Sequence, residues 1–250
     1  MANVQQGFGN SLSDAYFAFP PVTRYFATAC LGLSALVNFR IIHPYSIHLY
    51  WPLILKLQVW RLVTPFFYLG GWTFNLLIQL VWLLTYGKTL ETSTFQFSSP
   101  DYVYMLMFGM ACMSIASLLP FFKFGFFASS LIFMLIYVWS RNFPTSSVSL
   151  MGLVSIEAFY VPAAFVAMDL VTGKDWLGDV LGILVGHLYY TLKVLMPAQG
   201  RQSLLETPWW VKRMVYSSGI GTVNPREINP ENPTRPTFRA FRGQGQRLAG

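Results

Sequence analysis

The chain has 250 residues, of which 54% are hydrophobic and only 11% are charged, and its mean hydropathy is +0.46. A soluble domain has about 25% charged residues, so this composition excludes an ordinary soluble protein and indicates a membrane protein with several spans. The net charge of +7 is concentrated near the C-terminus, and no basic face suggests nucleic-acid binding. The two cysteines lie in apolar runs and predict neither a disulfide framework nor a metal site.

The first part of the chain predicts one span and a long loop. Residues 1–21 are polar and then aromatic, which favours a short helix at the membrane interface. The first span follows at Val22–Phe39. Residues 41–65 are apolar but interrupted by prolines, so we expect a first loop that lies partly in the interface. In this loop Arg61, beside Trp60, is expected either to bind backbone carbonyls and hold the loop or to reach lipid phosphates.

Four further apolar stretches predict the second to fifth spans, at Phe66–Tyr86, Asp101–Leu119, Phe124–Ser140 and Val148–Met168. Asn75 and Gln79 lie four residues apart in the second of the six spans, and Glu157 lies near the centre of the fifth. Polar groups at that depth are expected to face protein or water rather than lipid. The two amides could instead form a hydrogen bond between helices, and the carboxyl group should be protonated or paired.

The sixth span, Leu177–Met196, carries glycines at every fourth position, Gly178, Gly182 and Gly186, which therefore share one face of a helix. Glycines at this spacing let a second helix approach closely inside lipid, so we expect tight helix packing. His187 follows the last glycine near the middle of the span. An ionisable group at that depth is costly and indicates a functional site.

The basic tail predicts which way the chain lies in the membrane. From Ala198 onward the tail holds eight Lys or Arg residues, whereas the loops expected on the other side hold five, so both ends are expected in the cytosol. Residues 197–216 favour a juxtamembrane helix at the interface, and residues 217–250, rich in Pro, Gly and Asn, should be disordered. Phe241 and Leu248 are the strong apolar anchors of the last segment, which is either a linear binding motif or an unstructured end.

Several stretches of the sequence together resemble one family. They are Pro20-Pro21-Val22-Thr23-Arg24, Trp60-Arg61-Leu62-Val63-Thr64-Pro65-Phe66, Tyr137-Val138-Trp139-Ser140-Arg141, Tyr160-Val161-Pro162 and Gly182-x-x-x-Gly186-His187-x-Tyr189-Tyr190. In this order they are similar to the derlins, the rhomboid-like pseudoproteases of the endoplasmic reticulum. The segment Phe241-x-Gly243-x-Gly245-x-x-Leu248 resembles the short tail motif that binds a cytosolic AAA+ unfoldase, valosin-containing protein.

The resemblance implies an all-α membrane protein of the endoplasmic reticulum, with six transmembrane helices in a rhomboid-like fold over residues 22–196. It implies a part in ER-associated degradation, in which misfolded proteins return to the cytosol. The expected partners are those clients, the unfoldase, a membrane ubiquitin ligase, the lipid bilayer and further copies of the chain; no cofactor is expected. We also expect Asn75, Gln79, Glu157 and His187 to form a polar groove in a locally thinned bilayer, beside a lateral opening between the second and fifth spans.

Three other functions stay open on the sequence. An active rhomboid protease needs a Gly-x-Ser-Gly turn before the fourth span, but Ser129 and Ser130 follow Gly125 without a second glycine, so no catalytic residue is expected. A transporter that couples protons through Glu157 and His187 should show an internal repeat, and none is evident. An adaptor would act through the tail alone. Because the sequence has no phosphate-binding glycine loop, energy for extraction must come from the unfoldase.

Overall fold

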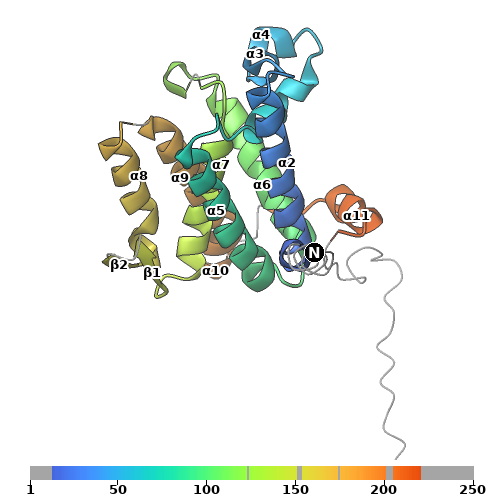
Figure 1. Ribbon diagram of the computed structural model, residues 1–250. Helices are drawn as coiled ribbons and strands as arrows, with labels where there is room; N and C mark the ends of the chain where they lie inside the picture. The colour runs from blue at the N-terminus through green and yellow to red at the C-terminus, as the bar shows by residue number, and fades with distance from the viewer. Residues whose placement is uncertain (1–12, 123, 151–153, 174, 201–204, 221–250) are drawn as a thin grey trace, which may run out of the picture.

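The computed structural model describes residues 13–122, 124–150, 154–173, 175–200 and 205–220 (Figure 1). The described part of the chain is mostly helical, as expected from the sequence. The tail motif at 241–248 and most of the tail lie outside the described residues. At the N-terminus, residues 13–17 are helical.

Six helices of 11 to 18 residues form the body of the molecule: α2 (Pro21–Asn38), α5 (Phe74–Thr89), α6 (Ser99–Ala116), α7 (Ala128–Asn142), α8 (Val161–Val171) and α9 (Trp176–Tyr190). α7 lies at the centre and contacts α5, α6, α8 and α9, while α2 packs against α5. Prolines occupy the first turn of α2, α6 and α8, where their missing N–H costs no hydrogen bond.

The short elements gather at the two ends of this bundle (Figure 1). One end carries the first loop, with α3 (Pro44–Ile47), α4 (Trp51–Ile54), η1 (Val59–Leu62) and η2 (Thr64–Phe66), and also η4 (Pro120–Phe122). The other end carries the π-helical η3 (Leu90–Thr94), the hairpin of β1 (Ser147–Leu150) and β2 (Val154–Glu157), η5 (Ala158–Tyr160) and α11 (Trp209–Ser217). The described residues at the N-terminus lie at this second end as well, near α11.

Beyond Tyr190, α9 continues as the π-helical η6 (Thr191–Leu195) and α10 (Met196–Ala198). Within the described residues, this stretch of 23 residues, Trp176–Ala198, is the one helix both long and apolar enough to cross a bilayer. The other five helices of the body do not combine the length and the hydropathy of a full span, and α8 has only 11 residues against the roughly 20 that a span needs. The number of membrane crossings therefore stays a prediction.

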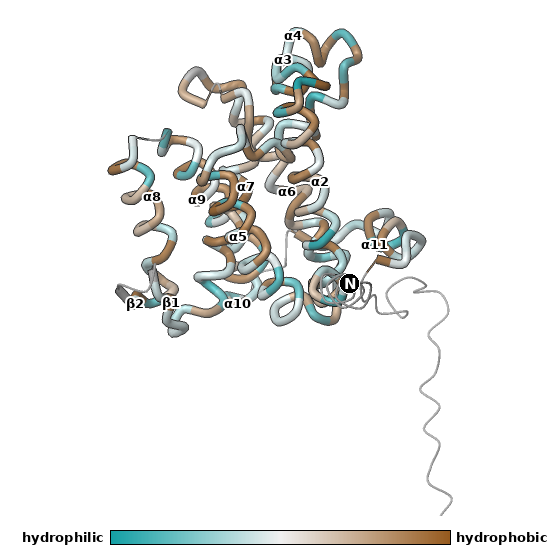
Figure 2. The backbone as a smooth tube through the Cα atoms, in the orientation of Figure 1, coloured by the Kyte–Doolittle hydropathy of each residue, from teal (hydrophilic) through white to brown (hydrophobic). Residues whose placement is uncertain are grey.

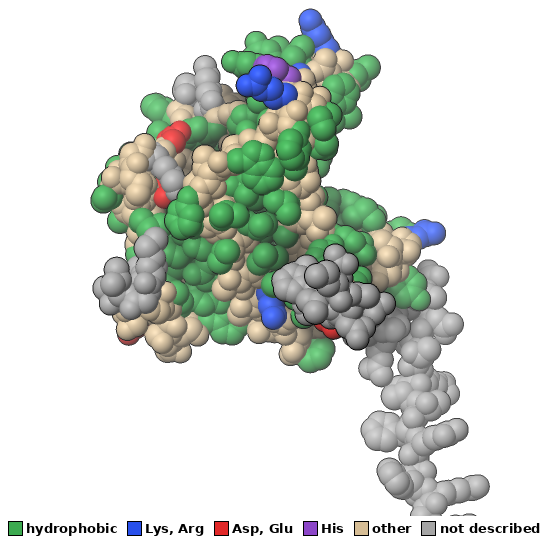
Figure 3. Space-filling model, in the orientation of Figure 1, with side chains coloured by type: hydrophobic (Ala, Val, Ile, Leu, Met, Phe, Trp, Pro, Cys, Tyr) green, Lys and Arg blue, Asp and Glu red, His purple; other side chains and the backbone are tan. Residues whose placement is uncertain are grey.

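Apolar residues fill the middle of the bundle, and charged residues lie towards its ends. Every residue of α7 from Ser130 to Ser140 is buried. Figure 2 shows hydrophobic residues along the middle of α5 and α7, and Figure 3 shows hydrophobic side chains across the middle of the visible face. Lys and Arg side chains on that face lie towards the two ends. This distribution agrees with the arrangement expected of a membrane protein.

Two of the predicted span boundaries are wrong. The helix of the second span begins at Phe74 rather than at Phe66, because the chain first makes η2 and then turns at Gly70, whose φ is +109°. The helix of the fifth span begins at Val161 rather than at Val148, because the antiparallel hairpin occupies the first part of the expected span and pairs Ser147 with Glu157.

Candidate functional site: an apolar cavity between α5 and α8

Helices α7 and α9 form a tight pair in the bundle beside α5 and α8. Gly182 faces α7 so closely that an added Cβ would overlap the carbonyl oxygen of Ser130 and would lie 2.9 Å from the Cβ of Phe133. At Gly186 an added Cβ would lie 3.1 Å from Tyr137, and at Gly178 it would lie 3.2 Å from the Ser130 hydroxyl. The three glycines thus lie along the contact line between the two helices, and Gly182 makes the closest approach.

Two polar pairs lie on the same interface. The Ser129 hydroxyl donates to Oδ1 of the buried Asp179 at 3.0 Å, near the start of α7. Two turns later, the Tyr137 hydroxyl and Nδ1 of the exposed His187 are 2.7 Å apart. Ser129 and Tyr137 are eight residues apart, or about 12 Å along a helix at about 1.5 Å per residue. His187 is therefore paired with a tyrosine well away from the serine that a catalytic dyad would need.

A cavity of about 820 Å³ opens between α5 and α8, with part of β1 beside it. It is lined by Phe74, Leu77, Ile78, Val81, Trp82, Thr85, Tyr86, Val148, Ser149, Ala164, Phe165, Ala167, Met168, Val171 and Thr172. Most of these side chains are apolar, and Thr85, Tyr86, Ser149 and Thr172 are the residues that carry a hydroxyl. A cavity of this volume and chemistry fits an apolar ligand or an apolar segment of a protein.

The helix α5 has two faces, and only one of them meets the cavity. Leu77 and Val81 are more than half exposed on the cavity side. On α8, Phe165 stacks on Trp82 of α5, with ring centroids 4.2 Å apart and an angle of 8° between the planes. This stacked pair connects α5 to α8 and closes the cavity on the side of the bundle core.

None of the four expected groove residues lines this cavity. Asn75 is half-buried in the first turn of α5, and Gln79 is buried on the opposite face from Val81. Among the described residues, Oε1 of Gln79 has no hydrogen-bond partner. His187 lies on α9 beside Tyr137, as described above. The structure does not bring the four side chains together.

The position expected for Glu157 is wrong. The sequence analysis places it near the centre of a helix, but it is the exposed last residue of β2. The physical reason is the serine and apolar alternation of both strands, which suits an antiparallel hairpin with one side buried. Helix α8 can then begin with Pro162 in its first turn, rather than hold a proline in its interior.

Arg61 organises the first loop. The residue is 6% exposed, and its guanidinium donates to Oε1 of Gln58 at 2.6 Å, to the carbonyl of Tyr45 at 2.6 Å and to the carbonyl of His48 at 3.1 Å. Trp60 is half exposed, and its indole N–H donates to the carbonyl of Ser46 at 3.3 Å. Both side chains therefore connect η1 to the residues in and around α3.

Glu91 is a polar core residue that sequence reasoning missed. It lies in η3, is 4% exposed, and accepts hydrogen bonds from the backbone N–H of Val22 at 2.9 Å and of Thr23 at 2.7 Å. Its Oε2 also accepts the Thr23 hydroxyl at 2.7 Å. The carboxylate thus satisfies free N–H groups in the first turn of α2, a position that the helix dipole also favours for a negative charge. No local signal reveals it, because Glu91 and Thr23 are 68 residues apart.

No group of three His, Cys, Asp or Glu side chains is close enough to hold a metal ion in the part of the chain that the structure describes. Cys30 is buried and Cys112 is half-buried, and both are free thiols.

A mostly helical bundle with a long apolar helix, a glycine-packed helix pair and an apolar cavity at its side is the architecture of a helical membrane protein. The family model described as "Der1-like family" matches residues 19–209. The chain is 39% identical to "Derlin-1" of Arabidopsis thaliana, with 96% of this chain and 99% of that protein covered. It is 36% identical to "Derlin-1" of Oryza sativa subsp. japonica over the same shares, and 31% identical to "Derlin-2.1" of Arabidopsis thaliana over 87% of this chain and 93% of that protein. The chain belongs to the Der1-like family.

Proposed function

We propose that this protein works in ER-associated degradation and helps misfolded proteins to leave the endoplasmic reticulum for the cytosol. The observation that carries the proposal is the apolar cavity of about 820 Å³ between α5 and α8 in a chain of the Der1-like family. A partly unfolded client needs a place where its apolar segments can leave the lipid in contact with protein. The cavity offers such a place on the side of the bundle.

The apolar lining suits apolar segments of a client rather than polar ones. The sequence analysis expects a polar groove, but the side chains along this cavity suit an apolar client segment instead. The sequence analysis also expects a locally thinned bilayer, and the length of α8 supports this. Its 11 residues span only about 16 Å, whereas a bilayer core is roughly 30 Å thick. Lipid beside α8 would be thinned, which shortens the apolar distance that a client has to cross.

We further propose that the membrane domain is not a protease and takes its driving force from the unfoldase. Ser129 is paired with Asp179 and His187 with Tyr137, and this pairing supports a catalytically inactive rhomboid-like fold. In the proposal the cytosolic tail binds the AAA+ unfoldase through Phe241, Gly243, Gly245 and Leu248. Phe241 and Leu248 would fill apolar pockets of the partner, because large side chains of this kind contribute most of the affinity of short motifs.

The cavity is tested with a photo-crosslinking amino acid at Val81, which lines the cavity and is 58% exposed. We expect crosslinks to a misfolded membrane client in microsomes when the unfoldase is inhibited. The matched control is the same probe at Ile115 of α6, which is 64% exposed but lies outside the cavity. Equal client crosslinking from both positions would contradict a client site between α5 and α8.

A cavity-filling substitution separates a groove function from an adaptor function. Ala167 is exposed and lines the cavity, whereas Ala163 is exposed one turn earlier on α8 and does not. We expect Ala167→Phe to slow client degradation several-fold and Ala163→Phe to leave it unchanged. An adaptor that acts only through its tail would tolerate both substitutions.

The tail is tested with the double substitution of Phe241→Ala and Leu248→Ala. We expect it to abolish co-purification of the unfoldase while the yield and membrane insertion of the protein stay normal. Phe238→Ala, three residues before the motif, is the matched control and should retain binding. Undiminished co-purification with the double variant would refute the proposed motif.

A further inference from the structure

A second cavity, of about 240 Å³, lies at the end of the bundle that carries η3 and α11. It is lined by Thr94, Phe95, Asp101, Val138, Asn142, Tyr189, Tyr190, Lys193 and Val194. Unlike the cavity between α5 and α8, it combines an apolar side with charged, amide and hydroxyl groups. At roughly 30 Å³ for each molecule it has space for several waters or for one small polar group.

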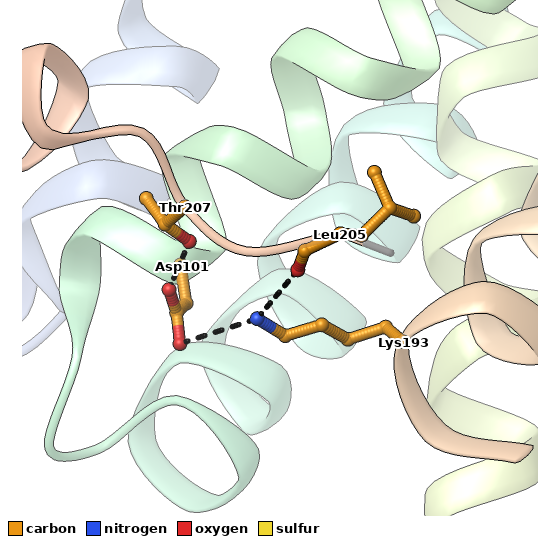
Figure 4. Close-up of polar contacts among 4 residues, drawn as sticks. All are labelled: Asp101, Lys193, Leu205 and Thr207. Carbon is orange, nitrogen blue, oxygen red and sulfur yellow. Dashed lines mark hydrogen bonds and ion pairs between the residues drawn. The ribbon is translucent and has the colours of Figure 1, made fainter. Parts of the chain in front are cut away.

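The charged side of this cavity is an ordered cluster (Figure 4). Nζ of Lys193 lies 3.9 Å from Oδ2 of Asp101 and donates to the carbonyl of Leu205 at 3.0 Å. The hydroxyl of Thr207 donates to the other carboxylate oxygen of Asp101. These contacts hold both charged side chains at the cavity, and each remains about one quarter exposed.

The buried end of the cavity contains a polar group without a partner. Tyr189 is 2% exposed, and its hydroxyl makes no hydrogen bond to any described residue. An unsatisfied buried hydroxyl costs roughly 1–3 kcal/mol, so a ligand that bonds to it would gain affinity. Asn142 uses one amide N–H on the carbonyl of Val138, which leaves its amide oxygen available.

Two π-helical segments border the cavity. Thr94 belongs to η3, whereas Lys193 and Val194 belong to η6. π-helical turns are rare and occur often at functional sites, because the wider turn re-aims side chains. At this cavity they direct Lys193 and Thr94 towards the same space from two helices.

We propose that this cavity binds a zwitterionic phosphoethanolamine group, as carried by a phospholipid headgroup. The phosphate would accept from Lys193 and Tyr189, and the ammonium group would donate to Asp101. A ligand with charges of one sign would meet repulsion from either Lys193 or Asp101, whereas a zwitterion satisfies both. Headgroups reach this depth because the cavity lies where α6 begins and α7 ends, at the end of the bundle.

The proposal predicts that phosphatidylethanolamine binds more tightly than phosphatidylcholine, which has the same phosphate but no N–H to donate to the carboxylate of Asp101. The same chemistry also exists in free phosphoethanolamine, so the experiment compares both sources. This site does not depend on the proposed role in degradation, since a headgroup can bind whether or not clients do.

The test is native mass spectrometry of the purified full-length protein, titrated in detergent with dihexanoyl-phosphatidylethanolamine, the corresponding phosphatidylcholine, the corresponding phosphatidylglycerol and free phosphoethanolamine. We expect one bound phosphatidylethanolamine and at least tenfold weaker binding of phosphatidylcholine and phosphatidylglycerol. Tyr189→Phe and Lys193→Gln should each weaken the binding at least fivefold. Tyr25→Phe and Lys88→Gln, which alter residues outside the cavity, should leave it unchanged.

The remaining outcomes either support the site or overturn it. Free phosphoethanolamine that binds as tightly as the lipid, and with the same sensitivity to Tyr189→Phe, supports the site and assigns it to a soluble ligand. Equal retention by wild type and both cavity variants would overturn the proposal. Tightest binding of phosphatidylglycerol would also overturn it. So would the absence of any retained ligand, which would mean that the cavity holds only water. Tyr189→Phe removes a single oxygen atom, and circular dichroism checks that the variant is folded.

Discussion

The contact between Gly182 and α7 makes a quantitative prediction about helix packing. In Gly182→Ala the new methyl group overlaps the carbonyl oxygen of Ser130 and lies 2.9 Å from the Cβ of Phe133. A backbone carbonyl in a helix cannot rotate away, so α7 and α9 must move apart, and overpacking of this kind costs typically 1–3 kcal/mol. The gain in helix propensity offsets about 1 kcal/mol of that cost. We expect a net destabilisation of up to about 2 kcal/mol, measured by SDS titration of the purified protein and followed by circular dichroism.

Three other helical glycines provide graded controls. Gly178→Ala meets only the Ser130 hydroxyl, which can rotate, so its effect should be close to zero. Gly186→Ala should cost less than Gly182→Ala because its neighbours are 3.1 Å away or more, whereas the larger Gly186→Val should disrupt the domain. Gly32→Ala on α2 meets nothing within 4 Å and should stabilise by up to about 1 kcal/mol. If Gly182→Ala proves as stable as Gly32→Ala, the packing argument is refuted.

Two buried polar contacts lead to further predictions. Glu91→Gln places an amide N–H against the N–H groups of α2 and should destabilise by about 2 kcal/mol, whereas Glu157→Gln, in the exposed hairpin, should change stability by less than about 0.5 kcal/mol. Equal SDS midpoints for these two variants would contradict the capping role of Glu91. Arg61→Lys loses the planar donor set that joins Tyr45 to the rest of the first loop, so limited proteolysis of that loop should become several-fold faster, with no such change in Lys56→Gln. Unchanged cleavage of Arg61→Lys would show that another contact holds the loop.

Much of the fold follows from hydrophobic length and helix-start signals. The first, third and sixth stretches predicted helices within a few residues of α2, α6 and α9. The fifth failed because a run of about 20 apolar residues was taken as one helix. The alternation Ser147-Val148-Ser149-Leu150, and Pro162 in the first turn of α8, were visible signals of a strand followed by a helix start.

The candidate site was harder to predict than the fold. The flanking elements of the cavity could be anticipated from the resemblance, but its lining could not, because the sequence does not show which face of a uniformly apolar helix meets lipid. Gln79 attracted attention as a polar residue, yet α5 turns it towards the bundle and presents Val81 to the cavity. Glu91 is not singled out by the sequence, since its partner is distant in sequence and only the tertiary structure brings the two together.

The bond from Glu91 to the start of α2 has a consequence for biosynthesis. The ribosome makes α2 before any other long helix described here, yet the carboxylate that completes its first turn is 68 residues further along the chain. During translation the N–H groups of that turn must therefore first be bonded by water or another group. The final position of α2 is fixed only after α5 and η3 have emerged, so nascent chains truncated before residue 91 should hold their first helix loosely and depend on the insertion machinery to retain it.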